Sequence, residues 1–414
     1  MEYGLIGERL GHSFSKTIHS LIGGYEYSLV EIPRDGLEDF LVRKEFCGIN
    51  VTIPYKESVI SYLDNVSEEV RKIGACNTIV CNNGVLSGYN TDYYGLRDLI
   101  IRNGIEIEGR KVLILGTGGT SHTARALVTD MGASQVKIAS RRAGAGDLTY
   151  SELADNYTDA QVIINATPCG MFPSNGDCPL SLEMFSKLEG VVDVIYNPIR
   201  SNIVLDAIGR GIKAAGGLYM LVAQAVYASA IWFGKEIDSA LIENIYGTIL
   251  SEKENICLIG MPSAGKTTCG EMIAEITGRE FYDSDIVIEE KAGMTIPEIF
   301  ATKGEKAFRE LETEVIAELA KKSSCIIATG GGVVLNPLNM RNLKQNGKIY
   351  FLDRNVENLL VTGDRPLSSS MEALRKMYEV RLPLYHAACD EVIDVNHSYE
   401  EAVADIKARH KIVK

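Results

Sequence analysis

Short apolar runs alternate along the chain with stretches whose apolar residues recur at helical spacing. In the N-terminal part, apolar runs predict strands at 1–7, 25–32 and 48–53, and helical spacing predicts helices ending near residue 22 and at 37–44 and 92–102. Strands that alternate with helices are typical of a parallel or mixed sheet with helical crossovers. The N-terminal part is therefore predicted to have an α/β fold.

A second series of the same kind lies between residues 103 and 218. Apolar runs predict buried strands at 111–116, 135–140, 161–165 and 191–196, and a helix is expected at 123–131. The glycine-rich turn Gly116-Thr117-Gly118-Gly119-Thr120 joins the first of these strands to that helix. A strand, a glycine turn and a helix in this order are typical of a Rossmann-like dinucleotide-binding domain.

Residues 260–267 read Gly-Met-Pro-Ser-Ala-Gly-Lys-Thr, the G-x-x-x-x-G-K-[ST] pattern of a phosphate-binding P-loop. An apolar run at 256–259 and helical spacing at 268–276 supply the strand and helix that flank such a loop, which favours this interpretation over an accidental glycine loop. Lys266 would reach the outer phosphates of a nucleotide, and the Thr267 hydroxyl would bind Mg²⁺. The residues expected at the nucleotide are Gly260, Ser263, Ala264, Gly265, Lys266, Thr267 and Thr268.

The stretch from 214 to 234 carries no charged residue and is long enough to cross a membrane. It begins with Ala-Ala-Gly-Gly, however, and it contains Gln224 and Ser229. We therefore expect a strand end, a turn and then a buried helix at about 219–233 rather than a membrane span. A further helix is expected near 238–250.

These patterns divide the chain into predicted domains. Residues 1–102, together with about 219–250, would form a substrate-binding domain. Residues 103–218 would form the Rossmann-like domain. The polar stretch 251–255 would link them to a P-loop α/β domain with a parallel sheet at 256–414.

Composition places the chain among ordinary globular proteins, because 46% of its 414 residues are hydrophobic and 23% are charged. The formal net charge of −13 argues against nonspecific nucleic-acid binding, since phosphate backbones select basic surfaces. The nine cysteines are scattered without C-x-x-C or zinc spacing, as expected of free thiols in a reducing cytoplasm. Glu2 and Glu8 also argue against a signal peptide, so a cytoplasmic protein is expected.

The end of the second strand in the Rossmann-like domain bears on the choice of cofactor. An NAD site places an acidic residue on the ribose hydroxyl at this point, whereas this strand ends in Ser140-Arg141-Arg142. Two guanidinium groups suit a 2′-phosphate, which favours NADP(H) over NAD(H). A solvated pair of surface arginines is the alternative.

Lys56 and Asp92 are candidates for proton transfer. Lys56 follows the end of a predicted strand, where sites are common, and Asp92 begins a predicted helix. A partly desolvated lysine beside a carboxylate can exchange a proton near neutral pH. The residues alone leave open that Asp92 caps its helix and that Lys56 is a surface lysine.

Motifs in the first 250 residues resemble those of shikimate dehydrogenases. They are G-H-S-F-S-K at 11–16, N-V-T-I-P-Y-K at 50–56, G-A-C-N-T at 74–78, N-T-D at 90–92, G-T-G-G-T-S at 116–121, I-N-A-T-P at 164–168 and M-L-V-A-Q-A at 220–225. The resemblance implies reduction of 3-dehydroshikimate to shikimate with NADPH, in which Lys56 and Asp92 handle the proton.

The same resemblance implies binding residues for this half of the chain. The implied substrate residues are Ser13, Ser15, Thr52, Asn77, Asp92, Tyr196 and Gln224. The two serines would hold the substrate carboxylate, since hydroxyl and N–H groups at a helix start suit an anion, with simple helix capping as the alternative. The implied NADP residues are Gly116, Gly118, Gly119, Thr120, Ser140, Arg141, Arg142, Asn165, Ala166, Thr167 and Gly217.

Polar residues gather again after the P-loop. Asp283 and Asp285 are two apart, and residues at this spacing share one side of an extended chain. Two such carboxylates indicate Mg²⁺ and a hydroxyl-bearing substrate, with an N-cap pair as the alternative. Arg309 and Glu312 are three apart and would share a helix face. Gly330-Gly331-Gly332 would form a strand-end loop with exposed N–H groups, or a plain loop.

Together with the P-loop, these features resemble shikimate kinases over about 253–414. The family order is completed by Phe308-Arg309-x-x-Glu312, Arg365-Pro366-Leu367 and Arg381-x-Pro383-Leu384-Tyr385. The resemblance implies ATP and Mg²⁺, with Thr267 and Asp283 at the metal, partly through water. Asp283 would also lie near the attacking oxygen, and Arg365 would close over the phosphates. The implied shikimate-binding residues are Asp285, Arg309, Gly330, Gly331, Gly332 and Arg381.

The chain departs from the kinase pattern at two places. Ser263 stands where the family commonly has glycine, which concerns the fit of the phosphates. The short segment 358–364 contains no arginine, although the family often stacks one on adenine there. The second departure concerns nucleotide affinity and the motion of the lid.

The two resemblances predict a bifunctional enzyme that makes shikimate and then phosphorylates its 3-hydroxyl. Its partners would be these small molecules, with no nucleic acid and no membrane, and a homo-oligomer stays open. One alternative is a ligand-sensing regulatory protein that keeps both sites, against which Lys56, Asp92, Lys266 and Asp283 argue. The other is a quinate-type dehydrogenase fused to another small-molecule kinase.

Overall fold

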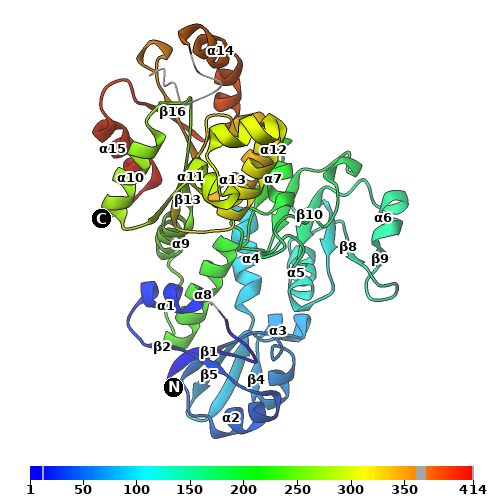
Figure 1. Cartoon of the computed structure of the whole chain (residues 1–414). Helices are drawn as coiled ribbons and strands as arrows, with labels where there is room; N and C mark the ends of the chain where they lie inside the picture. The colour runs from blue at the N-terminus through cyan, green and yellow to red at the C-terminus, as the bar shows by residue number, and fades with distance from the viewer. Residues whose placement is uncertain (12–13, 360–369, 413–414) are drawn as a thin grey trace. The chain divides into compact units, whose positions relative to one another are not determined.

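The structure, a computed structural model, describes residues 1–11, 14–359 and 370–412 (Figure 1). Its contacts divide the chain into two compact units, Met1–Ile249 and Leu250–Lys414. The first unit contains two sheets and the second unit contains one. Helices alternate with strands in both units, which confirms the predicted α/β class.

The first sheet is mixed. Strand β1 pairs in parallel with β2 and β3, whereas β5 pairs antiparallel with β3 and β6. Its strands in spatial order are β2 (Tyr27–Glu31), β1 (Tyr3–Gly7), β3 (Gly48–Val51), β5 (Thr78–Asn82), β6 (Val85–Tyr89) and β4 (Asn65–Val66). The helices of this stretch are α1 (Ser15–Ile22), α2 (Leu37–Arg43) and α3 (Glu68–Ile73). Ile6, Leu41 and Ile49 are fully buried in the core beside this sheet.

The second sheet is parallel throughout. Its strands in spatial order are β12 (Lys213–Ala215), β11 (Gly190–Asp193), β10 (Val162–Asn165), β7 (Lys111–Leu115), β8 (Gln135–Ser140) and β9 (Leu148–Thr149). Counted from β7, this is the order 3-2-1-4-5-6 of dinucleotide-binding folds, which confirms the Rossmann-like prediction. The helices of this stretch are α5 (Gly119–Asp130), α6 (Tyr150–Asn156) and α7 (Asn202–Gly209).

Helices α4 (Thr91–Arg102) and α8 (Leu218–Phe233) pack closely against each other. Gly95 of α4 permits this approach, because a Cβ atom there would lie 2.7 Å from the carbonyl oxygen of Met220 in α8. Helix α8 is the predicted charge-free helix, and most of its side chains are buried. Among the described residues, no helix has both the length and the apolar character needed to cross a membrane.

The sheet of the second unit is parallel throughout, as predicted. Its central strand is buried on both faces, because Ile256 and Leu258 belong to one hydrophobic cluster and Cys257 and Ile259 to another. The strands in spatial order are β14 (Glu280–Asp283), β15 (Cys325–Ala328), β13 (Asn255–Ile259), β16 (Gly347–Asp353) and β17 (Glu391–Asp394). The helices are α10 (Lys266–Thr277), α11 (Ser284–Ala292), α12 (Ile296–Leu319, kinked at Gly304), α13 (Pro337–Asn346), α14 (Met371–Ala388) and α15 (Tyr399–His410).

Helices α5 and α9 (Ser239–Lys253) extend well beyond one of their predicted bounds. Helix α5 begins at Gly119 instead of near residue 123, because the glycine turn leads directly into it with Gly118 as its N-cap. Helix α9 continues through most of the stretch that was expected as a linker. In this last part of the helix, the Ser251 hydroxyl donates to the carbonyl oxygens of His410 and Lys411 at 3.0 and 3.2 Å.

Gly95 allows a direct test of the contact between α4 and α8. We expect Gly95→Ala to lower the free energy of unfolding by about 1–3 kcal/mol, since the added methyl group meets a backbone oxygen that cannot move alone. Gly247 of α9 is the matched control, because a Cβ atom there would meet no atom within 4 Å. Gly247→Ala should therefore stabilise the chain by about 0.5–1 kcal/mol. Thermal unfolding measures both changes, and equal effects would contradict the proposed contact.

Because His410 is buried, we expect the stability of the second unit to depend on pH. Burial, reinforced by the cation of Arg279, lowers the pKa of His410 from 6.5 to about 4. As the pH falls, the unfolded chain therefore binds this proton before the folded chain does. The stability is complete above pH 6.5, and on the order of 3 kcal/mol is lost as the pH falls towards 4.

Urea unfolding followed by hydrogen exchange of peptides from β16 and α15 reports this loss for the second unit alone. In a His410→Gln variant, the pH-dependent part of the loss should be much smaller. If the variant loses as much stability between pH 6.5 and 4 as the unchanged chain does, His410 is not its source.

Candidate functional sites

Lys56 and Asp92 form an ion pair in the first unit. Lys56 lies after β3, Asp92 lies in the first turn of α4, and Nζ and Oδ2 are 2.6 Å apart. Their side chains are 23% and 14% exposed, so the pair is shielded but still reaches solvent. Asn90 is the N-cap of α4, because its side chain accepts a hydrogen bond from the Tyr93 N–H. The alternative in which Asp92 is a helix cap and Lys56 a surface lysine is therefore wrong.

The ion pair lines a cavity of about 310 Å³. Together with Lys56, the cavity brings together all of the described residues that the sequence predicted for the first substrate: Ser15, Thr52, Asn77, Asp92, Tyr196 and Gln224. Ser13 lies outside the described residues. Arg9 also lines the cavity, although the sequence reasoning did not single it out.

A buried hydrogen-bond network holds Asn77 in this cavity. The Asn77 Oδ1 accepts from the Thr91 N–H at 2.7 Å, and its Nδ2 donates to the Thr91 hydroxyl at 3.0 Å. Behind it, Asn50 donates to Thr78 at 3.1 Å and accepts from the Tyr27 hydroxyl at 2.9 Å. The sequence reasoning missed this second layer, although Asn50 and Thr91 both stand inside the quoted motifs.

A larger cavity of about 1230 Å³ begins at the end of β7. Gly116 needs its glycine, because its φ is +102° and a Cβ atom would lie 2.9 Å from Thr167. A Cβ atom at Gly118 or Gly119 would meet no atom within 4 Å, so the turn leaves open space at the start of α5. Backbone N–H groups at a helix start favour an anion, and this space fits the pyrophosphate of a dinucleotide.

Most of the predicted cofactor residues line this larger cavity. They are Gly116, Gly118, Gly119, Thr120, Ser140, Arg141, Arg142, Ala166 and Thr167. Both arginines are exposed, so their guanidinium groups are available to a phosphate, and the Ser140 hydroxyl accepts from the Arg142 N–H at 3.1 Å. The donor set therefore fits NADP(H) with its 2′-phosphate.

Two predicted cofactor residues lie elsewhere. Asn165 is fully buried, and its side chain accepts from Thr167 and donates to Asp193 at 3.1 Å, so it holds the turn after β10 instead of lining the cavity. Asp193, which accepts the hydrogen bond from Asn165, is itself buried, and this burial raises its pKa to about 6. Gly217 lines the smaller cavity.

The two cavities of the first unit share part of their lining. Thr52, Lys56, Thr120 and Tyr196 belong to both. A molecule in the larger cavity can therefore meet a molecule in the smaller one beside the Lys56 ammonium group. Transfer of a hydride between two bound molecules requires such an arrangement.

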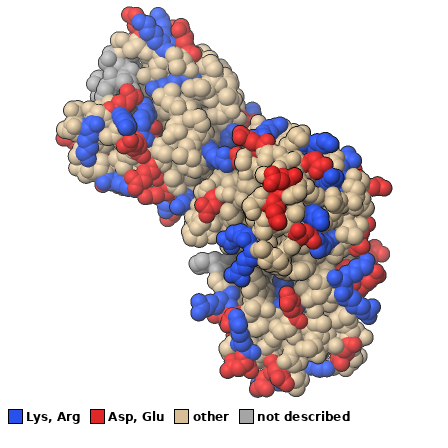
Figure 2. All heavy atoms as spheres, turned by 90° about the vertical axis from the view of Figure 1, so that its right-hand side faces the viewer, with Lys and Arg blue, Asp and Glu red and all other residues tan. Residues whose placement is uncertain are grey.

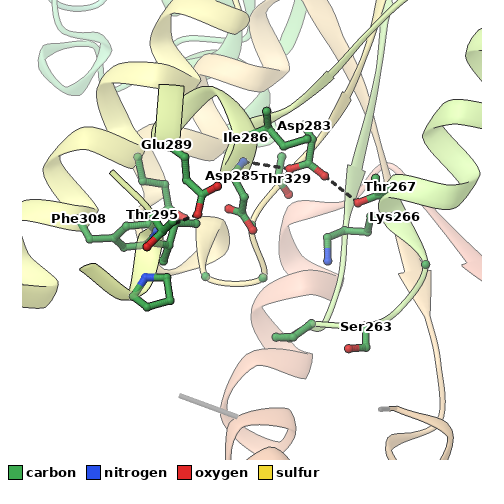
Figure 3. A pocket seen from close by; sticks show the side chains of 18 of the residues that line it. Ser263, Lys266, Thr267, Asp283, Asp285, Ile286, Glu289, Thr295, Phe308 and Thr329 are labelled. Atoms are coloured by element: carbon green, nitrogen blue, oxygen red, sulfur yellow. Dashed lines mark hydrogen bonds between the residues drawn. The ribbon is translucent and has the colours of Figure 1, made fainter. Parts of the chain in front are cut away.

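The second unit has a cavity of about 730 Å³ at the end of β13 (Figure 3). The P-loop contributes Ser263, Gly265, Lys266, Thr267 and Thr268 to its lining, whereas Gly260 and Ala264, which were also predicted, do not line the cavity. The Lys266 ammonium group donates to the carbonyl oxygens of Gly260 and Met261 at 3.0 and 2.8 Å. The lysine is thereby folded over the loop in the position from which it can meet phosphate oxygens.

Asp283 faces the P-loop from the end of β14 (Figure 3). Its Oδ2 accepts from the Thr267 hydroxyl at 2.7 Å, and its Oδ1 accepts from the Asp285 N–H at 3.0 Å. Asp283 is thus the N-cap of α11 and Asp285 is helical, so the extended arrangement assumed from their spacing is wrong. Both carboxylates nevertheless line the cavity. Asp283 therefore caps α11 and belongs to the site at the same time.

Arg309 and Arg381 approach the triple-glycine loop from α12 and α14, and all of these residues line the cavity. Arg309 pairs with Glu312 at 2.9 Å, as the shared helix face predicted, and Arg381 donates to the Gly331 carbonyl oxygen at 2.9 Å. A Cβ atom at Gly332 would lie 2.2 Å from the Arg309 guanidinium group, so a side chain there would displace that group. Burial raises the pKa of Glu312, although Arg309 opposes the shift.

The backbone at Ser263 shows why kinases of this pattern commonly have glycine there. Ser263 has a φ of +63°, a left-handed conformation that glycine adopts without strain and serine does not. The other departure concerns the segment 358–364, of which only Asn358 and Leu359 belong to the described residues. Arg365 lies outside the described residues as well.

Comparison with known proteins assigns both units. The family model of the shikimate dehydrogenase substrate-binding domain matches residues 5–79, and that of shikimate kinase matches residues 262–410. The NADP(+)-dependent shikimate dehydrogenase of Clostridium perfringens SM101 is 37% identical, over 59% of this chain and 96% of that protein. The enzyme of Nitrosopumilus maritimus is 33% identical, over 56% and 93%.

Solved structures give the same result. A chorismate mutase/shikimate 5-dehydrogenase fusion protein from Clostridium acetobutylicum is similar with a TM-score of 0.57 and 37% identity, over 60% of this chain and 96% of that chain. A Thermus thermophilus shikimate 5-dehydrogenase in complex with NADP(H) and shikimate has a TM-score of 0.54 at 29% identity, over 59% and 98%. The chain belongs to the shikimate dehydrogenase family and carries a shikimate kinase domain in its C-terminal part.

Proposed function

We propose that the chain catalyses two consecutive reactions, the NADPH-dependent reduction of 3-dehydroshikimate to shikimate and the ATP-dependent phosphorylation of shikimate. The observation that carries the proposal is that one chain holds both sites. A shielded Lys56–Asp92 pair lies where a substrate-sized cavity meets a dinucleotide-sized cavity, and a P-loop lies opposite two arginines in the other unit. The family matches of the two units support the same pair of activities.

In the first reaction, the chain positions the ketone and supplies a proton. Bound NADPH provides the hydride that adds to the ketone carbon. The Lys56 ammonium group gives its proton to the oxygen that becomes negative, and Asp92, at 2.6 Å from it, holds the ammonium group in place beforehand. Asn77, fixed by its bonds to Thr91, and Gln224 are placed to bind ring hydroxyls.

In the second reaction, the chain aligns a hydroxyl group with a phosphate and balances charge. Phosphoryl transfer depends mainly on positioning and electrostatic stabilisation. Lys266 and the loop N–H groups would bind the transferred phosphate, and Arg309 and Arg381 would hold the shikimate carboxylate. Asp283 and Asp285 would receive the hydroxyl groups on the side that faces the P-loop.

Mg²⁺ fits the same place. The Thr267 hydroxyl and the Asp283 carboxylate are hard oxygen ligands that already touch each other at 2.7 Å. Among the described side chains, no group of three or more His, Cys, Asp or Glu could hold a metal ion. A metal at Thr267 and Asp283 would therefore complete its shell with phosphate oxygens and water, as Mg²⁺ prefers.

The proposed activities require only small-molecule partners, because all residues used lie in one chain. On the face shown in Figure 2, the Lys and Arg side chains of the described residues are interspersed with Asp and Glu. Anionic substrates would then be bound by the groups inside each cavity. All nine cysteines are free, and we place the chain in the reducing cytoplasm.

Two lysine variants test the two activities separately. Lys56→Met should lower the rate of 3-dehydroshikimate reduction by about 10²- to 10⁴-fold, because it removes the proton donor. Lys266→Met should lower the rate of shikimate phosphorylation by about 10²- to 10³-fold, because it removes a cation from the transferred phosphate. Absorbance of NADPH and mass spectrometry of the phosphorylated product measure the two rates.

Each variant serves as the control for the other, since a correctly folded chain keeps the activity of the unchanged unit. An unchanged chain that reduces no 3-dehydroshikimate would remove the dehydrogenase proposal. An unchanged chain that phosphorylates no shikimate would remove the kinase proposal.

Arg141 and Arg142 predict a preference for NADPH. The double change to glutamine should raise the KM for NADPH by about 10- to 100-fold and leave the KM for NADH within about threefold, because only NADPH carries the 2′-phosphate. Arg110→Gln is the control. Arg110 precedes β7, whereas the cofactor cavity lies at the other end of this strand, and Arg110 pairs with Glu189 at 2.8 Å. An equal effect on both cofactors would contradict the assignment.

A further inference from the structure

Three of the residues around the smaller cavity carry a charge, among those that the structure describes. They are Arg9, Lys56 and Asp92. The last two neutralise each other at 2.6 Å. The other polar groups of the lining, such as Ser15, are uncharged. Arg9 therefore gives the cavity its net positive charge.

The substrate of the proposed reduction is a carboxylate. An anion that leaves water for a cavity loses hydration, and neutral hydroxyl groups recover only part of that free energy. A guanidinium group recovers more, because it offers two parallel N–H donors to the two carboxylate oxygens. The charge of the cavity thus favours a contact between the substrate carboxylate and Arg9.

Arg9 is also in a suitable place. It lies between the end of β1 and the start of α1, in the same segment as Ser15. The neighbouring Leu10 N–H donates to Glu31 at 2.8 Å, which fixes the backbone beside Arg9. Its side chain is exposed, and it makes no hydrogen bond or ion pair with the described part of the chain. The guanidinium group is therefore available to a ligand.

We propose that Arg9 is a substrate-binding residue of the dehydrogenase unit that holds the carboxylate of 3-dehydroshikimate and shikimate. This inference rests on the proposed reduction. Arg9 then fixes the end of the substrate remote from the ketone, while Lys56 and Asp92 act at the other end. The contact selects carboxylates over neutral ring compounds of the same size.

Two variants at this position test the inference. Arg9→Gln should raise the KM for 3-dehydroshikimate by about 10- to 100-fold, with kcat changed less than about threefold, because the lost contact is made to substrate and transition state alike. Arg9→Lys should recover part of the loss, since it keeps the charge but not the paired donors. The KM for NADPH and the phosphorylation rate should not change.

The matched control is Arg34→Gln. Arg34 is exposed, lies on the same unit and pairs with Glu8 at 3.1 Å, but it does not line the cavity. The Arg34→Gln variant removes the same charge from the unit without touching the site. Its KM for 3-dehydroshikimate should therefore equal that of the unchanged chain. A rise in both variants would indicate a general charge effect and would overturn the inference.

Direct binding separates the carboxylate contact from other causes. Calorimetry should show that Arg9→Gln weakens binding of shikimate by the same factor that raises the KM, whereas the methyl ester of shikimate should bind equally to both chains. Equal loss for acid and ester would assign Arg9 to another part of the substrate and overturn the proposal. If the unchanged chain reduces 3-dehydroshikimate and Arg9→Gln has an unchanged KM, the inference about Arg9 fails while the proposed function stands.

Discussion

The contact between α4 and α8 at Gly95 is the constraint on which the dehydrogenase site depends. Asp92 lies one turn before Gly95 on α4, and Gln224 lies on α8 where a Cβ atom at Gly95 would be 3.2 Å from its own Cβ. Helix α8 in turn contacts α1, which begins with Ser15. A single close approach between two helices thus sets the separation of groups that come from three distant segments of the chain.

The two units solve the problem of phosphate binding in the same way with different sheets. In each unit, a glycine with positive φ directly follows a central strand of the parallel sheet. Gly116 (φ +102°) follows β7 and Gly260 (φ +151°) follows β13, and a helix starts a few residues later. The turn directs backbone N–H groups into a cavity at the carboxyl end of the strand. The side chains that line the two cavities differ, with Arg141 and Arg142 in one unit and Lys266 with Thr267 in the other, and these would distinguish the ligands.

Features that depend on local pattern could be predicted from the sequence. The buried strands, the glycine turns and α8 follow from runs and spacing of a few residues, and the family motifs brought Lys56 and Asp92 together across 36 positions. Other features depend on contacts that spacing does not encode. Asn90 and not Asp92 caps α4, Asp285 is helical, and Asn165 points into a buried turn because Thr167 and Asp193 hold it there. Arg9 was missed because a lone arginine in a loop gives no signal until the cavity beside it is known.

The ion pair of Lys56 and Asp92 has a consequence for the reaction cycle. In the proposed reduction, the pair is neutral as a whole before it gives up its proton, and afterwards it would carry one negative charge beside a product that is itself an anion. The side chains are 23% and 14% exposed, so solvent can return the proton without any opening of the fold. Between these two events the negative charge of the pair would offset the positive charge of Arg9, so the cavity as a whole would be neutral while it holds shikimate. The cavity would thus attract the anionic substrate more strongly than the product that it has just formed, and the return of the proton from solvent would restore its positive charge for the next ketone.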